Sequence, residues 1–207
     1  MSIAGPYNLS FTAASLRPEL ARIVAEHYLT CGDWQKTKAW VLATNALQCR
    51  SSASAVRLER EMRSRLQDLT KGEMELLARS TLDERILVAW LAAVKHSAFL
   101  FDFAGELLRG KLDLHEPVLR SSDYDRFIEE KSPVHPELAD LTESSAAKVR
   151  RVLLRMLREA GILQKGDGLG IIHRPLVPLR VVATIREDKS RWLAAFLVPE
   201  SEIRHRA

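Results

Sequence analysis

The segment from Leu82 to about Leu112 is apolar almost all round at helical spacing, and it constrains the fold more than any other part of the 207-residue chain. A helix that is apolar on every side has to be covered by other elements, so we expect a central buried helix or a pair of them. Its longest uninterrupted apolar run, Ile86 to Val94, is far shorter than the roughly 20 residues that cross a bilayer. We therefore expect a helical core and no membrane contact.

Amphipathic helical periods account for most of the chain before this segment. Apolar residues recur every three or four positions in four stretches, which we expect to be helices: about 18–30, 34–47, 52–69 and 72–80. Gly32 suits the end of the first helix, and Asp33 suits the N-cap of the second. Aromatic content of only 6%, with no run of alternating Val, Ile and Thr, argues against an all-β protein. We predict a mainly α fold in which residues 1–116 form a helical bundle domain.

After Pro117 the pattern changes to short elements. DYDRFIEEK and ELADL predict two short helices, and a longer basic helix follows them, with Thr142 or Ser144 as N-cap and Gly161 at its end. ILQKGDGLGIIH, two short apolar stretches around KGDG, is typical of a β-hairpin. This order outlines a winged helix-turn-helix, in which the helix before the hairpin enters the major groove of DNA. We predict a winged-helix-like domain over residues 117–207 with one short hairpin, a closing helix in REDKSRWLAAFL and a basic tail.

The basic helix gathers cations on one face. At about 100° per residue, four cations fall within one narrow stripe: Lys148, Arg151, Arg155 and Arg158. Most of its apolar side chains fall on the other side of the helix. The net charge is only +4, so contact with a polyanion has to come from clustering of this kind. The stripe is our first candidate for binding DNA, and a merely solvated surface is the alternative.

A second cluster of arginines lies upstream, in CRSSASAVRLEREMRSR. Arg50 precedes a predicted helix whose N-terminal amides and serine hydroxyls suit a phosphate oxygen, and Arg57 lies within that helix. The same stretch also contains Arg60, Arg63 and Arg65, and the acids Glu59 and Glu61 dilute its charge. We therefore include Arg50 and Arg57 as candidate DNA-binding residues and keep a capped surface helix with internal ion pairs as the alternative.

The sequence predicts no catalytic, metal or cofactor site. Cys31 and Cys49 lack the short paired spacing of a zinc site, so we expect free thiols in a reducing, cytoplasmic protein without a secretory signal. His96, Ser97 and Asp102 have the residue types of a hydrolytic triad, but adjacent helical positions point in different directions. We expect instead a core histidine or a polar seam between helices. No phosphate-binding loop, dinucleotide turn or nucleophile elbow occurs.

Four stretches of the chain resemble the BrxA family, accessory proteins of the BREX bacteriophage-exclusion systems. They are NLSFTAASL, NALQCRSSASAVR, AVKHSAFLFDF and KVRRVLLRMLREAGIL, and together the resemblance covers about residues 7–175. The Lys-His-Ser stretch is the most specific of them. None of the four carries catalytic residues, so the resemblance rests on pattern.

The resemblance implies a mostly helical protein, similar in part to the NusB fold, that binds double-stranded DNA without being an enzyme. It also implies other BREX components as partners: a methyltransferase, an ATPase and a phosphatase-like protein. Two alternatives stay open, an adaptor that docks an acidic partner within the defence complex and a winged-helix regulator of its own locus. RNA also stays open as a ligand, because a NusB-like fold could equally favour it and the sequence has no aromatic platform for stacking bases that would settle the choice.

Overall fold

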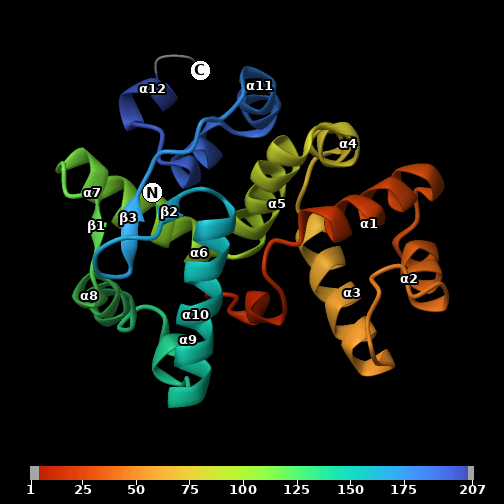
Figure 1. Cartoon of the computed structure of the whole chain (residues 1–207), viewed down its shortest axis with the longest axis horizontal. Coiled ribbons are helices and arrows are strands. Elements are labelled where there is room, and N and C mark those ends of the chain that lie inside the picture. Colours follow the sequence, from red (N-terminus) through yellow and green to blue (C-terminus); the bar gives the residue numbers. More distant parts are fainter. Residues whose placement is uncertain (1–4, 205–207) are drawn as a thin grey trace.

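The computed structural model describes residues 5–204 of the chain, which are mainly helical with a small antiparallel sheet near the C-terminus (Figure 1). The first five helices are α1 (Pro18–Cys31), α2 (Trp34–Ala43), α3 (Ser52–Gln67), α4 (Lys71–Arg79) and α5 (Leu82–His96). α1 packs against each of the other four. Gly32 ends α1 in the left-handed region (φ 65°), and the Asp33 carboxylate caps α2 by accepting two backbone N–H bonds. The four predicted helices and these two boundaries are confirmed, but the second helix ends at Ala43 rather than near residue 47, because the chain turns at Asn45 (φ 48°).

The predicted central segment is a pair of helices with a sharp bend between them. α5 and the following helix meet at 115°, and the second helix consists of α6 (Ala98–Asp102), a π-helical turn (Phe103–Leu108) and α7 (Arg109–Asp113). Ser97 takes an extended conformation at the bend (φ −128°, ψ 106°). Trp90, Phe99 and Phe103 are completely buried in the core that surrounds both helices. Within residues 5–204, no single helix is long and apolar enough to cross a membrane.

The next part of the chain builds the sheet. Its elements are β1 (Val118–Leu119), α8 (Ser121–Lys131), α9 (Pro136–Ala139), α10 (Glu143–Glu159), β2 (Leu163–Gln164) and β3 (Gly170–Ile172). β2 and β3 form the predicted hairpin. β1 adds a third antiparallel strand, which pairs with β3 on the side opposite to β2 and places Val118 opposite Ile171. The sequence did not predict β1, because two residues are too short for an alternating pattern.

The C-terminal part contains α11 (Leu179–Asp188), a 3₁₀-helix (Ser190–Phe196) and α12 (Glu200–Arg204). The prediction of one closing helix in REDKSRWLAAFL is wrong. α11 starts before the predicted segment and ends at Asp188, because Lys189 is extended (φ −154°, ψ 119°). The 3₁₀-helix that follows then places its apolar residues in the core. The Trp192 indole N–H donates to Asp188 and fixes the corner (2.9 Å). The predicted basic tail lies largely outside the described residues.

The segment Tyr7–Leu16, which we call the N-terminal strap, joins the first helices to the sheet region. It includes a 3₁₀ turn (Ser10–Ala13) and contacts both α3 and α10. At its end, the Leu16 N–H donates to the Glu159 carboxylate in the last turn of α10 (2.8 Å). The hydrophobic core runs without a break from Tyr7 to Ile203. The division into domains at residue 116 stays a prediction.

Candidate nucleic-acid interface

The basic helix α10 is held by a well-formed cap and a buried apolar face. The Thr142 hydroxyl accepts a bond from the Ser145 N–H, and Gly161 takes a left-handed conformation (φ 71°) just after the helix. The apolar face is buried through Val149, Leu153, Leu154, Met156 and Leu157. Both ends agree with the predicted boundaries. The burial of one face fixes which side of α10 is presented to solvent.

All four predicted cations of this helix lie on its exposed side. For the side chains of Lys148 and Arg151, the structure gives no ion pair or hydrogen bond within residues 5–204. Arg155 pairs with Glu159 (2.9 Å), and Arg158 donates to the Leu169 carbonyl in the hairpin (3.0 Å). An exposed ion pair of this kind contributes little stability, so Arg155 can exchange Glu159 for a phosphate at small cost. We call these four side chains the α10 stripe.

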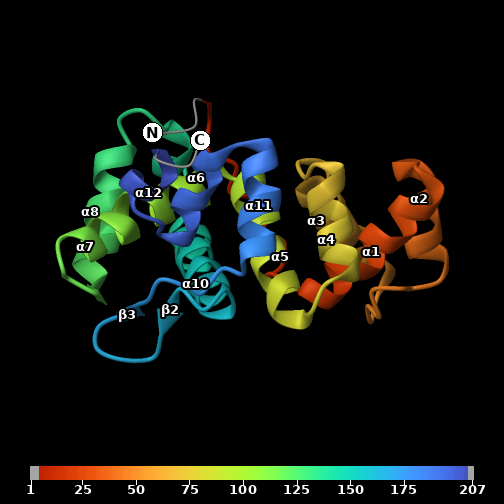
Figure 2. The same cartoon turned by 90° about the horizontal axis from the view of Figure 1, so that it is seen from above.

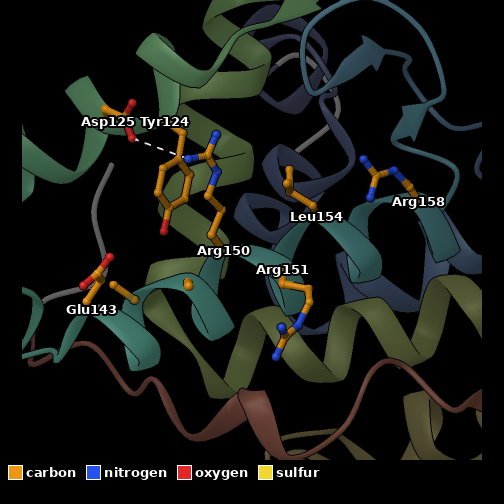
Figure 3. Close-up of a pocket in the computed structure, with 9 residues that line it drawn as sticks. Tyr124, Asp125, Glu143, Arg150, Arg151, Leu154 and Arg158 are labelled. Carbon is orange, nitrogen blue, oxygen red and sulfur yellow. Dashed lines mark ion pairs between the residues drawn. The ribbon is translucent and has the colours of Figure 1, made fainter.

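A hollow of about 530 Å³ between α8 and α10 borders the stripe (Figure 3). Arg151 and Arg158 line it, and so does Arg150, which the sequence analysis did not single out. The Arg150 guanidinium lies 5.0 Å from the centre of the Tyr124 ring and donates to the Ser121 hydroxyl (2.7 Å). Burial raises the pKa of Tyr124 to about 12, so its phenol stays protonated beneath this cation. Arg150 fastens α8 to α10 and so orients the stripe.

The hairpin beside α10 depends on two glycines. Gly168 has φ +62°, and a Cβ there would lie 2.5 Å from the Leu119 carbonyl oxygen. Gly170 has φ +144°, and its Cβ would lie 2.5 Å from the Gln164 carbonyl oxygen. Any larger residue would push the hairpin away from its neighbouring backbone. The exposed tip contains Lys165 and Asp167, whose charges cancel.

Only part of the upstream arginine cluster is exposed to solvent. Arg50, Arg57 and Arg60 are exposed. Arg63 pairs with the buried Glu59 (2.7 Å), and Arg65 is itself buried (3% exposed). Arg63 and Arg65 therefore form the internal ion pairs of the alternative interpretation, whereas the two candidates of this cluster, Arg50 and Arg57, stay exposed.

Arg65 instead holds the N-terminal strap. Its guanidinium pairs with Glu61 (2.7 Å) and donates to three carbonyls of the strap, those of Phe11, Ala14 and Ser15 (2.8–3.1 Å). No local sequence pattern indicates this role, because these partners lie about 50 residues away along the chain. The strap separates α3 from α10 in Figure 1, so the exposed arginines of α3 and the α10 stripe are two distinct basic surfaces.

His96, Ser97 and Asp102 form a polar seam, but most of its bonds join the helices to the strap rather than helix to helix. His96 lies between Asp68 (2.7 Å) and Asn8 (2.9 Å), and the Ser97 hydroxyl donates to the Asn8 carbonyl (2.7 Å). Asp102 accepts from the Tyr7 hydroxyl (2.9 Å). Burial and the charge of Asp102 raise the pKa of Tyr7.

These bonds turn the three triad-like side chains toward three different partners. His96 does not hydrogen-bond Ser97, so the structure does not assemble the relay that nucleophilic catalysis requires. Over residues 5–204, no group of three or more His, Cys, Asp or Glu side chains is placed to hold a metal ion. Cys31 and Cys49 are free and half-buried.

The comparisons with known proteins agree on one family. The family BrxA matches residues 5–189. The BREX protein BrxA of Escherichia coli O9:H4 (strain HS) is 30% identical over 141 residues, which are 68% of this chain and 66% of that protein, just under two thirds of its length. The BREX protein BrxA of Paramagnetospirillum magneticum (strain ATCC 700264 / AMB-1) is 26% identical over 157 residues, 76% of this chain and 79% of that protein.

A solved structure has the same fold. The crystal structure of an uncharacterized protein from Magnetospirillum magneticum superposes with a TM-score of 0.80 at 22% identity and covers 93% of this chain and 98% of that one. That likeness extends to the sheet region and the C-terminal helices, because it covers nearly the whole of both chains. The family match covers most of the chain as well, and the chain belongs to the BrxA family of BREX proteins.

Proposed function

We propose that the protein is a non-enzymatic, double-stranded DNA-binding accessory protein of a BREX phage-defence system, acting in the cytoplasm without a cofactor. The observation that carries the proposal is the α10 stripe, four cations on the exposed face of a helix whose other face is buried. Lys148 and Arg158 are ten residues apart, so the stripe extends about 15 Å along the helix axis. That length matches several successive phosphates of a duplex.

The order of elements around α10 supports a winged-helix mode of binding. α8, α9 and α10 are followed directly by the β2–β3 hairpin, and β1 pairs with β3 on the side away from β2. In helix-turn-helix proteins the second, recognition helix enters the major groove. By that arrangement α10 is the recognition helix and the hairpin is the wing. The bond from Arg158 to Leu169 couples the two elements, so that they meet the duplex as one surface.

Phosphate contacts carry most of the binding in this proposal. Lys148 and Arg151 reach phosphates without breaking an internal bond between described side chains, whereas Arg155 first has to leave Glu159. The wing adds little charge, because Lys165 and Asp167 cancel. Four phosphate contacts correspond to a slope of about −3.6 in a plot of log affinity against log salt. Arg50, just before the N-cap of α3, and Arg57 on α3 provide a second and smaller contact, because acidic partners engage Arg63 and Arg65 of that helix.

The test is a binding titration against duplex DNA, single-stranded DNA and RNA at two salt concentrations. Lys148→Ala with Arg151→Ala is expected to weaken duplex binding for all sequences and to reduce the salt slope by about two, since each removed cation takes away about one phosphate contact. Lys36→Ala with Lys38→Ala on α2 is the control, because it makes the same change in charge away from α10.

Each of the following results would contradict the proposal. Wild-type duplex binding with no salt dependence, or a stripe variant that binds like the wild type, would mean that the stripe is a solvated surface. Preference for RNA over duplex DNA would assign the stripe to another nucleic acid. Failure to bind any nucleic acid would favour the adaptor hypothesis, and binding to one sequence only would favour a regulator of the locus.

A further inference from the structure

The most exposed leucines of the protein fall in two surface patches of opposite charge. Leu176 (96% exposed), Leu179 (82%) and Leu114 (73%) are three of the four most exposed large hydrophobic side chains within residues 5–204. Leu176 lies in the connection from β3 to α11, Leu179 is the first residue of α11, and Leu114 lies just after α7. Exposed apolar side chains that cluster on a surface are typical of interaction sites.

The first patch is a rigid apolar ridge, His173–Arg180, on the surface between β3 and α11 (Figure 2). The His173 N–H donates to the Ile162 carbonyl (2.8 Å), and the Arg174 guanidinium donates to the Leu197 carbonyl (2.7 Å). Val177 packs against the core, and Pro178 has the backbone angles of polyproline II (φ −57°, ψ 145°). The ridge is thus fixed before it meets a partner, which lowers the entropic cost of binding.

The ridge is also basic. Between residues 168 and 186 the sequence contains three arginines and no Asp or Glu. Arg180 is exposed directly beside Leu179. A surface that covers the two leucines therefore also meets this guanidinium, and it binds better where it carries carboxylates.

The second patch is a groove of about 310 Å³ between α7 and α8 that offers both apolar side chains and carboxylates. Its apolar lining comes from Leu107, Leu114 and Phe127. Glu130 is exposed at the groove, and the structure gives it no ion pair within residues 5–204. The groove is lined by four acids and two cations, so it is acidic overall: Glu106, Glu116, Asp123 and Glu130 against Lys111 and Arg126.

The sheet brings the two patches to the same end of the molecule. The Ile172 N–H donates to the Pro117 carbonyl (2.7 Å), so the chain leaves β3 into the ridge beside the point where the groove segment enters β1. Two copies related by a two-fold axis can then each place a ridge in the groove of the other. Such an arrangement makes every contact twice, which is how small patches reach the area of a stable interface.

We propose that a second copy of this chain is the partner: the Leu176–Arg180 part of the ridge enters the α7–α8 groove of the other copy, with Arg180 facing Glu130. The contact covers Leu176, Leu179 and Leu114 together and pairs a basic surface with an acidic one. It does not depend on DNA binding, because the α10 stripe takes no part in it.

Sedimentation velocity without DNA, up to about 1 mM protein, tests the proposal. The wild type is expected to associate into dimers as concentration rises. Arg180→Glu and Glu130→Arg are each expected to stay monomeric, because each places like charges opposite one another twice in a dimer. An equimolar mixture of the two variants is expected to dimerise again, since every contact in the mixed dimer then joins opposite charges.

Two more variants separate this contact from other causes. Leu176→Ser with Leu179→Ser is expected to be monomeric, whereas Leu82→Ser, at an exposed leucine at the start of α5, is expected to dimerise like the wild type. Circular dichroism verifies that each variant is folded, as expected for changes at exposed positions. A wild type that stays monomeric, a dimer that survives both charge reversals, or a mixture that stays monomeric would overturn the proposal.

Discussion

The helices α3 and α10 are both rich in arginine, but they use it differently. In α3 two glutamates lie four residues before two of the arginines, and the pairs Glu59–Arg63 and Glu61–Arg65 both form. In α10 the acids stand only at the two ends, Glu143 and Glu159. The stripe between them stays exposed. The position of the acids, rather than the number of arginines, decides whether a basic helix is structural or free to bind.

The physical reason lies in helical geometry. A glutamate four residues before an arginine shares its face, and this order is also the one that the helix dipole favours. Once paired, the two side chains bring no uncompensated charge into the interior. The cost of burying Arg65 falls further because three strap carbonyls accept hydrogen bonds from its remaining N–H groups. The α10 stripe, whose one acidic partner among the described residues is the half-exposed Glu159, has no such route into the core and remains in solvent.

The largest expected effect in this comparison is on stability. Arg65→Met leaves the buried Glu61 carboxylate and three strap carbonyls without their donor, and we expect a loss of about 3–5 kcal/mol in the free energy of unfolding. Urea unfolding followed by circular dichroism measures it. Arg60→Met, at an exposed position of the same helix, is the control and is expected to change stability by less than about 0.5 kcal/mol. Equal stability of the two variants would show that Arg65 is no more structural than its exposed neighbour.

The same contrast explains what the sequence could predict. Helical period fixes the angle of each α10 cation from the sequence alone, so the exposed stripe and its caps were predicted. Burial of Arg65 depends on the strap, and the role of Arg150 depends on Tyr124 and Ser121 of α8; neither contact leaves a local pattern. β1 pairs with β3 across more than 50 residues. The break at Lys189 lies within a continuous amphipathic pattern, so local spacing could not reveal it.

A smaller effect is expected on DNA binding from the exposed arginines at the N-terminal end of α3 and just before it. Arg50→Ala with Arg57→Ala removes two cations, like the stripe variant Lys148→Ala with Arg151→Ala, but at a surface separated from α10 by the strap. We expect the salt slope for duplex DNA to fall by less than the change of about two that the stripe variant produces. Parallel titrations of both variants measure the difference. If the α3 variant loses the larger share, α3 is the main contact and the comparison is reversed.

The smallest expected effect comes from moving the α3 pattern into α10. Ala147 is exposed and lies four residues before Arg151, so Ala147→Glu creates the spacing that pairs Glu59 with Arg63. The new pair is expected to change helix stability by only about 0.3–0.5 kcal/mol, while the added charge offsets one cation of the stripe and reduces the salt slope by about one. Ala147→Gln has a similar shape without the charge and is expected to keep the wild-type slope. Both variants keep every stripe cation. Equal salt slopes for Glu and Gln would mean that charge at this face does not govern binding. A reduced slope for Glu alone would mean that duplex affinity depends on the positive charge of this face.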